Sequence, residues 1–286
     1  MKKTNLLLIL GSAASIVCGC ANSPATENET LLSKQEDFVN LLNVKNVPLQ
    51  ERHYGAYVFA DMGSWSAYAL PENEGYEYCG SFIGPMVMTG RGWIAATLAQ
   101  PSIKVNDNEF DLERNIQTAK YLPGKLIQEF NNKDIHFTTE LCFATNRTAV
   151  VRSVIKNVSG QPMHVSLEWV GGVFNKKSQL TTAGNSVSVL HFPDSTVTTT
   201  CFRTADKVRL VNTDSLHVCE KNDIVLPADA EYRSEYTQTL MLRREDSAKE
   251  LAAVRNIDID KCFAENKVRW DNNIDKLLSR DSEYLS

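Results

Sequence analysis

The sequence lacks the features that identify several large classes of protein. It has no excess of basic residues, because 30 Lys and Arg stand against 35 Asp and Glu, giving a formal net charge of −5 at pH 7. This balance excludes the basic field of a nucleic-acid-binding protein. The sequence also contains no Cys-x-x-Cys pair and no Gly-x-Ser-x-Gly motif. It therefore predicts neither a zinc or redox site of that spacing nor the nucleophile of an α/β-hydrolase.

The sequence also lacks the residue patterns of metal, cofactor and nucleotide sites. Four histidines have no second ligand at metal spacing: His53, His164, His191 and His217. His136 and Glu140 are four residues apart, which in a strand separates them by ~13 Å. Residues 171–178 contain two glycines and two lysines, but they lack the glycine spacing and the helix of a phosphate-binding loop. The sequence therefore predicts no catalytic residue, no cofactor and no metal site.

The N-terminus has the composition of an export signal. Lys2-Lys3 precede a short apolar run at residues 6–10, which is too short for a permanent membrane-spanning helix. Val17-Cys18-Gly19-Cys20 resembles the bacterial lipobox, which implies cleavage before Cys20 and lipidation of its thiol. An ordinary signal peptide cleaved elsewhere is the alternative. We expect a signal peptide at residues 1–19, a tether at residues 20–32, and an exported bacterial lipoprotein, periplasmic or anchored to the outer membrane through lipid on Cys20.

Five cysteines remain beyond the predicted lipidation site Cys20: Cys79, Cys142, Cys201, Cys219 and Cys262. An odd number in an exported protein leaves at least one thiol free. Cys201 and Cys219 lie on neighbouring predicted strands, so a bridge between them is one interpretation. Burial of these residues as small apolar side chains is the other.

Short strands dominate the centre of the chain, and residues 124–169 have the clearest pattern. Residues 126–130, 135–143 and 148–155 are strand-like runs, with one polar turn at residues 131–134 and a second turn at residues 157–162. Met163, Val165, Leu167 and Trp169 then alternate with polar residues, which is typical of a half-buried strand. These four strands predict an antiparallel meander. Some dozen strands at similar spacing predict an all-β fold, a large two-sheet antiparallel β-sandwich at residues 33–245.

The composition becomes helical after the last predicted strand. Residues 247–254 favour a helix in which Ser247 is the N-cap and Glu250 completes a capping box. Residues 260–278 carry apolar side chains in a broken pattern of spacings of three and four, which also favours a helix. We therefore expect a helical connector at residues 246–286.

Acidic and aromatic residues occur together near the start of the predicted sandwich. Asp61 lies close to Trp65 and Tyr68, and a second group follows with Glu72, Glu74, Tyr76, Glu77 and Tyr78. This composition is typical of a loop that contacts sugar, and it is also typical of an ordinary sandwich edge. Asp61, Trp65 and Tyr68 are the predicted residues for a sugar contact or a domain interface.

Two groups of residues resemble bacterial glycoside hydrolase family 63 α-glucosidases. Phe59-Ala-Asp61-Met-Gly63-Ser-Trp65, followed by Leu70-Pro71, is similar to the family stretch Phe-x-Asp-Leu-Gly-Ala-Trp-His…Leu-Pro. Pro123-Gly124-Lys-Leu-Ile-Gln, with Leu141-Cys-Phe143-Ala144-Thr145-Asn-Arg147-Thr148, resembles Pro-Gly-x-Leu-x-Gln…Leu-Arg-Phe-Ala-Thr-x-Arg-Thr. The helix that contains Trp270 resembles the segment that closes the family's N-terminal domain. The resemblance covers about residues 50–280, and residues 123–148 are its most specific part.

The resemblance implies a large N-terminal β-sandwich followed by an (α/α)₆ barrel. In that family the general acid and the general base both belong to the barrel, so the resemblance places no catalytic residue in this chain. One position departs from the pattern, because Ser66 stands where the family has His. The resemblance therefore does not imply a contact between this loop and a catalytic domain.

Three interpretations follow. The first is the non-catalytic sandwich domain of a family-63-like glycosidase, truncated or split from its barrel, inactive alone and docked against a helical catalytic domain. The second is a stand-alone lipoprotein that binds glycans. The third is a structural or assembly lipoprotein. We favour the first, because the chain ends soon after the predicted helix at residues 260–278.

Overall fold

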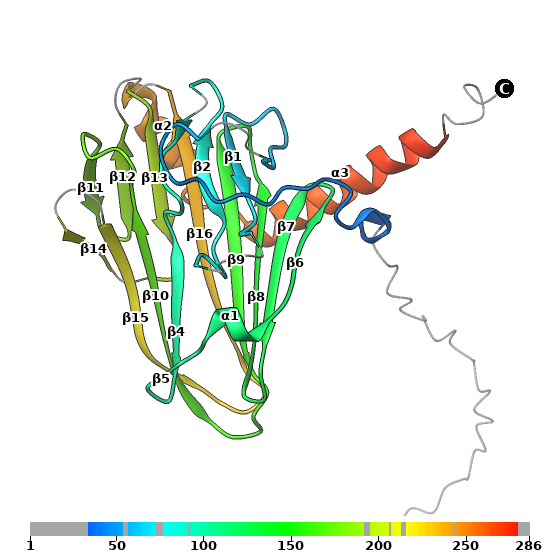
Figure 1. Cartoon of the computed structure of the whole chain (residues 1–286), viewed down its shortest axis with the longest axis vertical. Helices are drawn as coiled ribbons and strands as arrows, with labels where there is room; N and C mark the ends of the chain where they lie inside the picture. The colour runs from blue at the N-terminus through cyan, green and yellow to red at the C-terminus, as the bar shows by residue number, and fades with distance from the viewer. Residues whose placement is uncertain are drawn as a thin grey trace, which may run out of the picture. The chain divides into compact units, whose positions relative to one another are not determined.

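Two antiparallel sheets form the body of the protein (Figure 1). The computed structural model describes residues 34–53, 57–72, 77–90, 92–191, 195–205, 207–212, 216–242 and 244–279. Within these residues, the larger sheet has the order β11 (Gln179–Ala183), β12 (Ser186–Leu190), β13 (Val197–Phe202), β16 (Glu231–Met241), β9 (Thr148–Asn157), β8 (Ile135–Phe143), β7 (Lys125–Asn131) and β6 (Ile116–Leu122). The predicted all-β sandwich is confirmed.

The second sheet and a small third sheet complete the β-structure of the described residues. The second sheet has the order β14 (Lys207–Asn212), β15 (Leu216–Leu226), β10 (Met163–Gly172), β4 (Gln100–Val105) and β5 (Asn108–Glu109). The third contains β1 (Ser66–Ala69), β2 (Ile83–Val87) and β3 (Gly92–Trp93).

The predicted meander is correct for three of its four strands. β7, β8 and β9 pair in sequence order, with Leu141 opposite Val151. The Asn132 side chain fixes the first turn, because its Oδ1 accepts the N–H groups of Asp134 and Ile135 at 2.8 and 2.9 Å. The prediction was wrong for β10, which pairs with β15 and β4 in the other sheet. Its alternating apolar side chains cover the core from the opposite side, and the pattern alone does not distinguish the two arrangements.

Aromatic side chains fill the space between the two main sheets. Phe130 and Phe137 are fully buried, with ring centroids 5.6 Å apart. From the other sheet, Trp169 lies 5.3 Å from the ring of Tyr236 and 6.3 Å from that of Phe202. Residues of alternate parity on β8 point away from this core, so the larger sheet has a second face on which helices pack.

The described helices are η1 (Lys34–Phe38), α1 (Leu112–Asn115), α2 (Arg244–Val254) and α3 (Ile259–Ser279). The prediction of a helix at residues 260–278 is confirmed by α3. Its N-cap is Asp258, whose Oδ1 accepts the Lys261 N–H at 3.0 Å. The prediction that Ser247 is an N-cap was wrong, because α2 begins three residues earlier, at Arg244. None of the helices in the described ranges is both long and apolar enough to cross a membrane.

Several predictions concern residues outside this description. Cys20 and the predicted signal and tether, residues 1–32, lie outside it, as do Glu74 and Tyr76. The interpretation of a Cys201–Cys219 bridge was wrong. Cys201 is a free cysteine on β13 whose thiol donates to Asn185 Oδ1 at 3.7 Å, whereas Cys219 belongs to β15 in the other sheet.

Candidate domain-docking surface

Asp61 holds α3 against the start of the sandwich. Its carboxylate accepts two hydrogen bonds from the Arg269 guanidinium, of which the Nη1–Oδ1 bond measures 3.1 Å. It accepts a third bond from Trp270 Nε1 at 3.0 Å. The Asp61 side chain is only 6% exposed, so these charge-assisted bonds form away from bulk water. The predicted contact residue Asp61 is therefore engaged within the chain.

The local backbone explains how Asp61 reaches α3. Met62 and Gly63 both have left-handed backbone conformations, with φ of 57° and 64°. These two residues form a tight turn in which Asp61 Oδ1 accepts the Met62 N–H at 2.7 Å and the Asp61 carbonyl accepts the Ser64 N–H at 2.9 Å. The turn fixes the direction of the carboxylate.

Gly124 receives the same part of α3 from the β6–β7 turn. Asn266 Nδ2 donates to the Gly124 carbonyl at 2.6 Å. Gly124 has a φ of 90°, and a Cβ at this position would overlap the Trp270 indole and the Asn266 amide. Only glycine permits this approach. The two motifs that carried the family resemblance, around Asp61 and Gly124, therefore meet on one helix.

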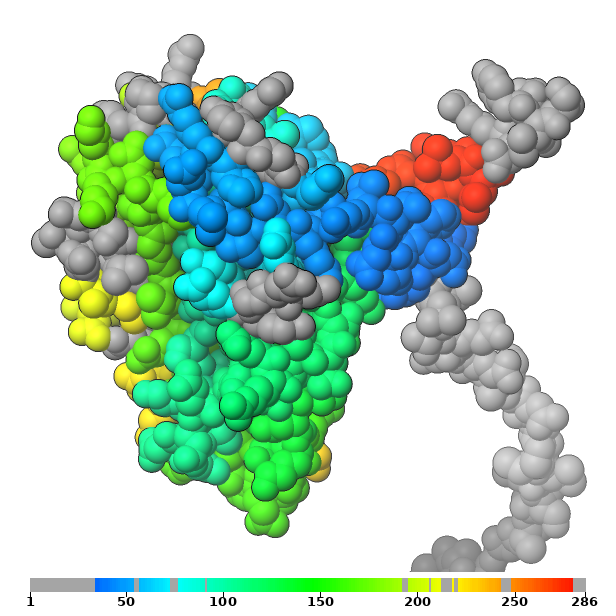
Figure 2. All heavy atoms as spheres, viewed as in Figure 1, coloured from blue at the N-terminus to red at the C-terminus, as the bar shows by residue number. Residues whose placement is uncertain are grey.

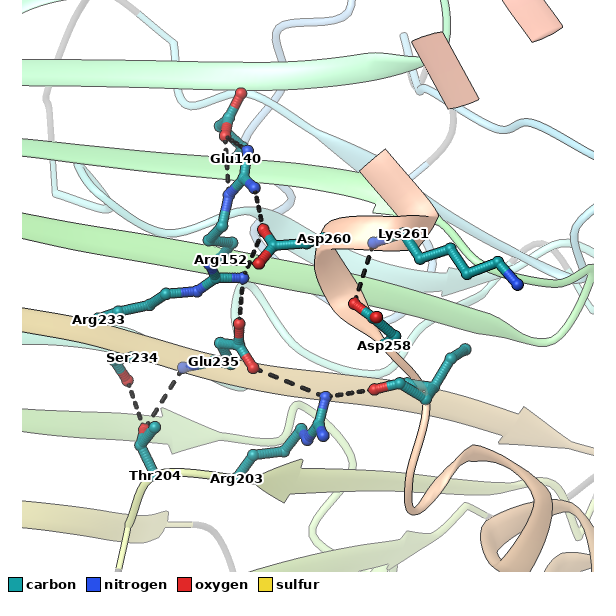
Figure 3. A network of polar contacts seen from close by, with 11 residues as sticks. Glu140, Arg152, Arg203, Thr204, Arg233, Ser234, Glu235, Asp258, Asp260 and Lys261 are labelled. Carbon is teal, nitrogen blue, oxygen red and sulfur yellow. Dashed lines mark hydrogen bonds and ion pairs between the residues drawn. The ribbon is translucent and has the colours of Figure 1, made fainter. Parts of the chain in front are cut away.

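An ionic network joins the N-terminal turn of α3 to the outer face of the larger sheet (Figure 3). Asp260 accepts from Arg152 at 2.7 Å and from two nitrogens of Arg233 at 2.8 Å. These bonds, above all those from Arg233, hold the pKa of Asp260 below its usual range. Asp260 also lies in the first turn of α3, where the helix dipole favours a negative charge.

Glu140 is the more buried partner of Arg152 in this network. Its side chain is 15% exposed and accepts from Arg152 Nε at 3.2 Å and from Lys125 Nζ at 3.2 Å. Burial acts to raise the pKa of Glu140, but the two cations outweigh it, so the pKa lies below its usual range. The network and the Asp61 contacts hold α3 at two places along its length.

Trp65 and Tyr68, the other two predicted contact residues, occupy different surroundings. Trp65 is partly buried, and the Arg147 guanidinium lies 4.6 Å from its ring centroid. Tyr68 is 1% exposed, lies 5.9 Å from the Phe143 ring, and has its pKa raised by burial. The structure thus places Tyr68 in the core, without surface to offer a glycan or another domain. A contact through Trp65 stays a prediction.

The apolar stripe of α3 continues past the part that the sheet covers. Phe263 and Ile274 are buried at 8% and 4% exposure, and Leu277 and Leu278 follow at the spacing that keeps them on the same side of a helix. These leucines are 67% and 57% exposed. Figure 1 shows the last turns of α3 projecting past the edge strand β6. The end of α3 therefore presents apolar side chains that the described sandwich does not cover.

A second exposed apolar group lies on the segment that follows η1. An ion pair between Lys34 and Asp275 joins η1 to α3, and Figure 2 shows the two segments side by side in blue and red. Leu41 and Leu42, shortly after η1, are 67% and 54% exposed. Exposed apolar groups of this kind are typical of surfaces that bind another domain. We call Leu41, Leu42, Leu277 and Leu278 the exposed leucines; Leu49, which is also exposed, is not included in this name.

The polar side chains of the described residues can be compared with the requirements of a metal site. Among the described residues, no three or more His, Cys, Asp and Glu side chains are grouped as a metal would require. The polar residues that meet at α3 are instead bound to one another, so their arrangement fits the attachment of a helix.

Sequence and structure comparisons agree with this architecture. Residues 48–258 match a family model described as "Glucosidase YgjK, N-terminal". No curated protein sequence matches the chain. A protein described as a kojibiose phosphorylase from the human microbiome is similar in structure, with a TM-score of 0.53 and 13% identity. The similarity covers 73% of this chain but 34% of the phosphorylase, so this chain spans about a third of that protein's length.

A second solved structure is more distant. The Slr1438 protein of Synechocystis has a TM-score of 0.47 and 7% identity, over 69% of this chain and 99% of its own. At such identities the likeness to solved structures concerns the fold alone.

Proposed function

Because this chain belongs to the family of glucosidase YgjK N-terminal domains, within glycoside hydrolase family 63, we propose that it is a non-catalytic β-sandwich that supports an α-glucosidase-type catalytic domain. The observation that carries the proposal is the convergence of Asp61 and Gly124 on α3. Family membership supports the proposed class of enzyme, and this convergence supports α3 as the element that links the sandwich to a catalytic domain.

The sandwich sets the position of α3, and α3 sets the position of the catalytic domain. Asp61 and the Asp260 network attach α3 at two points, which limits its rotation on the sheet. A helix attached in this way presents Leu277 and Leu278 in a defined direction. A helical domain can bury such leucines by helix-to-helix packing, which stabilises the complex by roughly 1.5–3 kcal/mol for each leucine that is fully buried. The exposed leucines are thus the proposed contact.

We further propose that the chain is an exported bacterial lipoprotein, periplasmic or anchored to the outer membrane. The pattern Val17-Cys18-Gly19-Cys20 supports this proposal, with Cys20 as the lipidated residue. Lipid on Cys20 and a tether of residues 20–32 would hold the sandwich close to the membrane while leaving it free to bind its catalytic domain.

A binding experiment tests the docking proposal. The catalytic barrel of a YgjK-type glucosidase is produced as a separate polypeptide and mixed with this chain, and complex formation is measured by analytical ultracentrifugation. We expect a complex with the wild-type chain and its loss with Leu277→Asp/Leu278→Asp. Leu49→Asp is the matched control, because Leu49 is 82% exposed, does not lie on α3 and is not one of the exposed leucines. A complex that survives the double substitution would exclude these leucines as the contact.

A further inference from the structure

A cleft on the second sheet is lined by none of the residues that attach α3. Its volume is about 390 Å³, and it lies where β10 ends beside the start of β4. Val170 of β10 is paired with Gln100 of β4. Leu167 and Trp169 point into the core, so by alternation Val170 points to the outer face. Helix α3 packs on β8 and β9 of the other sheet, so the cleft and the docking surface are separate.

Two aromatic rings contribute to the wall of the cleft. Tyr78 and Phe174 both line it, and both are partly buried against the same apolar cluster, which includes Ile83 and Trp93. Packing on a common cluster limits the movement of the rings. Partial burial and, after it, the Glu77 carboxylate raise the pKa of the Tyr78 phenol above its usual range, so the phenol is neutral at physiological pH. Both aromatic rings in the wall of the cleft are therefore uncharged.

Gln100 lines the cleft, and its side-chain amide carries an acceptor oxygen without a partner among the described residues. Its Nε2 donates to the Cys79 carbonyl at 2.9 Å, and because a carbonyl can only accept, this bond fixes which side of the amide carries the oxygen. The Gln100 Oε1 is buried and has no hydrogen-bond partner in the described part of the chain. A buried acceptor without a donor is unfavourable. This oxygen has almost no exposed surface, so a hydroxyl group in the cleft reaches it only when the Gln100 side chain turns toward the cleft.

The backbone of β10 forms another side of the cleft. Gly171 and Gly172 carry no side chains there, so a ligand can approach the main chain closely. The segment is held in place by Gly172 N–H to the Thr97 carbonyl at 3.4 Å and by Phe174 N–H to the Ile94 carbonyl at 3.0 Å. The lining contains no charged side chain among the described residues. These features fit a neutral ligand.

We propose that this cleft binds a neutral saccharide of one or two pyranose units. A pyranose has an apolar C–H face that can stack on Tyr78 or Phe174, and its hydroxyl groups can donate to Gln100 Oε1 once that side chain turns toward them. The volume lies within the range of about 300–1,000 Å³ typical of small-molecule sites, which combine apolar walls with a few placed polar groups. This binding is additional to the proposed support of a catalytic domain and does not depend on the exposed leucines.

The test uses the full chain carrying Cys20→Ser, titrated with maltose, cellobiose and N,N′-diacetylchitobiose and followed by NMR. We expect saturable shifts of the Gly171 and Gly172 amides with at least one disaccharide. Gln100→Leu and Phe174→Leu should each weaken binding about tenfold, which corresponds to 1.4 kcal/mol. Tyr57→Leu, which removes a 61% exposed ring elsewhere, should leave it unchanged.

Two results would overturn the proposal. One is the absence of saturable shifts with all three disaccharides, and the other is binding whose shifts map away from Gly171 and Gly172. The mapping uses the wild-type cleft and so does not depend on whether the cleft variants fold. Because Leu277→Asp/Leu278→Asp leaves the cleft intact, failure of saccharide binding and failure of domain docking are separate outcomes.

Discussion

Removing the Asp61 carboxylate should release α3 from the sandwich. Asp61→Ala leaves the Arg269 guanidinium and the Trp270 indole N–H without their acceptor. Breaking a buried, hydrogen-bonded ion pair costs roughly 3–5 kcal/mol. The Arg269 side chain is 31% exposed, so water restores part of its solvation. We therefore expect a loss of about 3 kcal/mol in the free energy of unfolding, at the lower end of that range.

Two measurements define the result. Urea unfolding gives the total loss, and amide hydrogen exchange shows where it occurs, because amides of α3 should lose protection while those of β8 keep theirs. Glu265→Ala is the matched control on the same helix. Glu265 is 68% exposed and 3.7 Å from Lys261, so its removal should cost less than about 0.5 kcal/mol. If Asp61→Ala is as mild as Glu265→Ala, the Asp61 contacts do not hold α3 on the sandwich.

Further predictions concern the β6–β7 turn, the ionic network and the N-terminus. Gly124→Ala should destabilise the protein by at least about 2 kcal/mol more than Gly160→Ala in thermal unfolding, because both glycines have positive φ but only Gly124 has α3 within reach of a Cβ; equal effects would contradict the close approach. The lowered pKa of Glu140 contributes stability above the unfolded-state pKa of about 4.3, and this stability is lost as the pH falls through the lower folded-state pKa. Glu140→Gln should therefore flatten the fall of the urea midpoint below about pH 4.3, and an unchanged slope would show that Glu140 is not the group responsible. Metabolic labelling with palmitate should mark the wild-type chain but not Cys20→Ser, and label on both would place the lipid elsewhere.

The sequence was sufficient for the fold class because hydrophobic alternation reports local geometry directly. Ile135, Phe137 and Leu141 alternate with polar residues and lie in the core as that pattern requires. The partner of β10 was not predictable in the same way. Alternation shows which side chains are buried but not which sheet buries them, and β10 reaches its sheet by pairing with residues 100–105 and 216–226.

The attachment of α3 was only partly predictable. The resemblance drew attention to Asp61, Gly124 and Trp270, but no local pattern joins residues that are more than 200 positions apart, as Asp61 and Arg269 are. Tyr68 shows the opposite case. The acidic and aromatic residues around it in the sequence suggested a surface contact, whereas tertiary packing buries the Tyr68 ring against Phe143. The ionic network that contains Glu140 and Asp260 forms only when α3 packs on the sheet. The pattern of a single sequence does not predict which distant residues pack together.

The most direct test of the central claim is the rate of hydrolysis of an α-glucoside by the separately produced barrel, measured with and without this chain. Support of a catalytic domain predicts no turnover by the chain alone and a faster rate when the wild-type chain is added to the barrel. Leu277→Asp/Leu278→Asp should remove the increase. Turnover by the purified chain alone would contradict the claim.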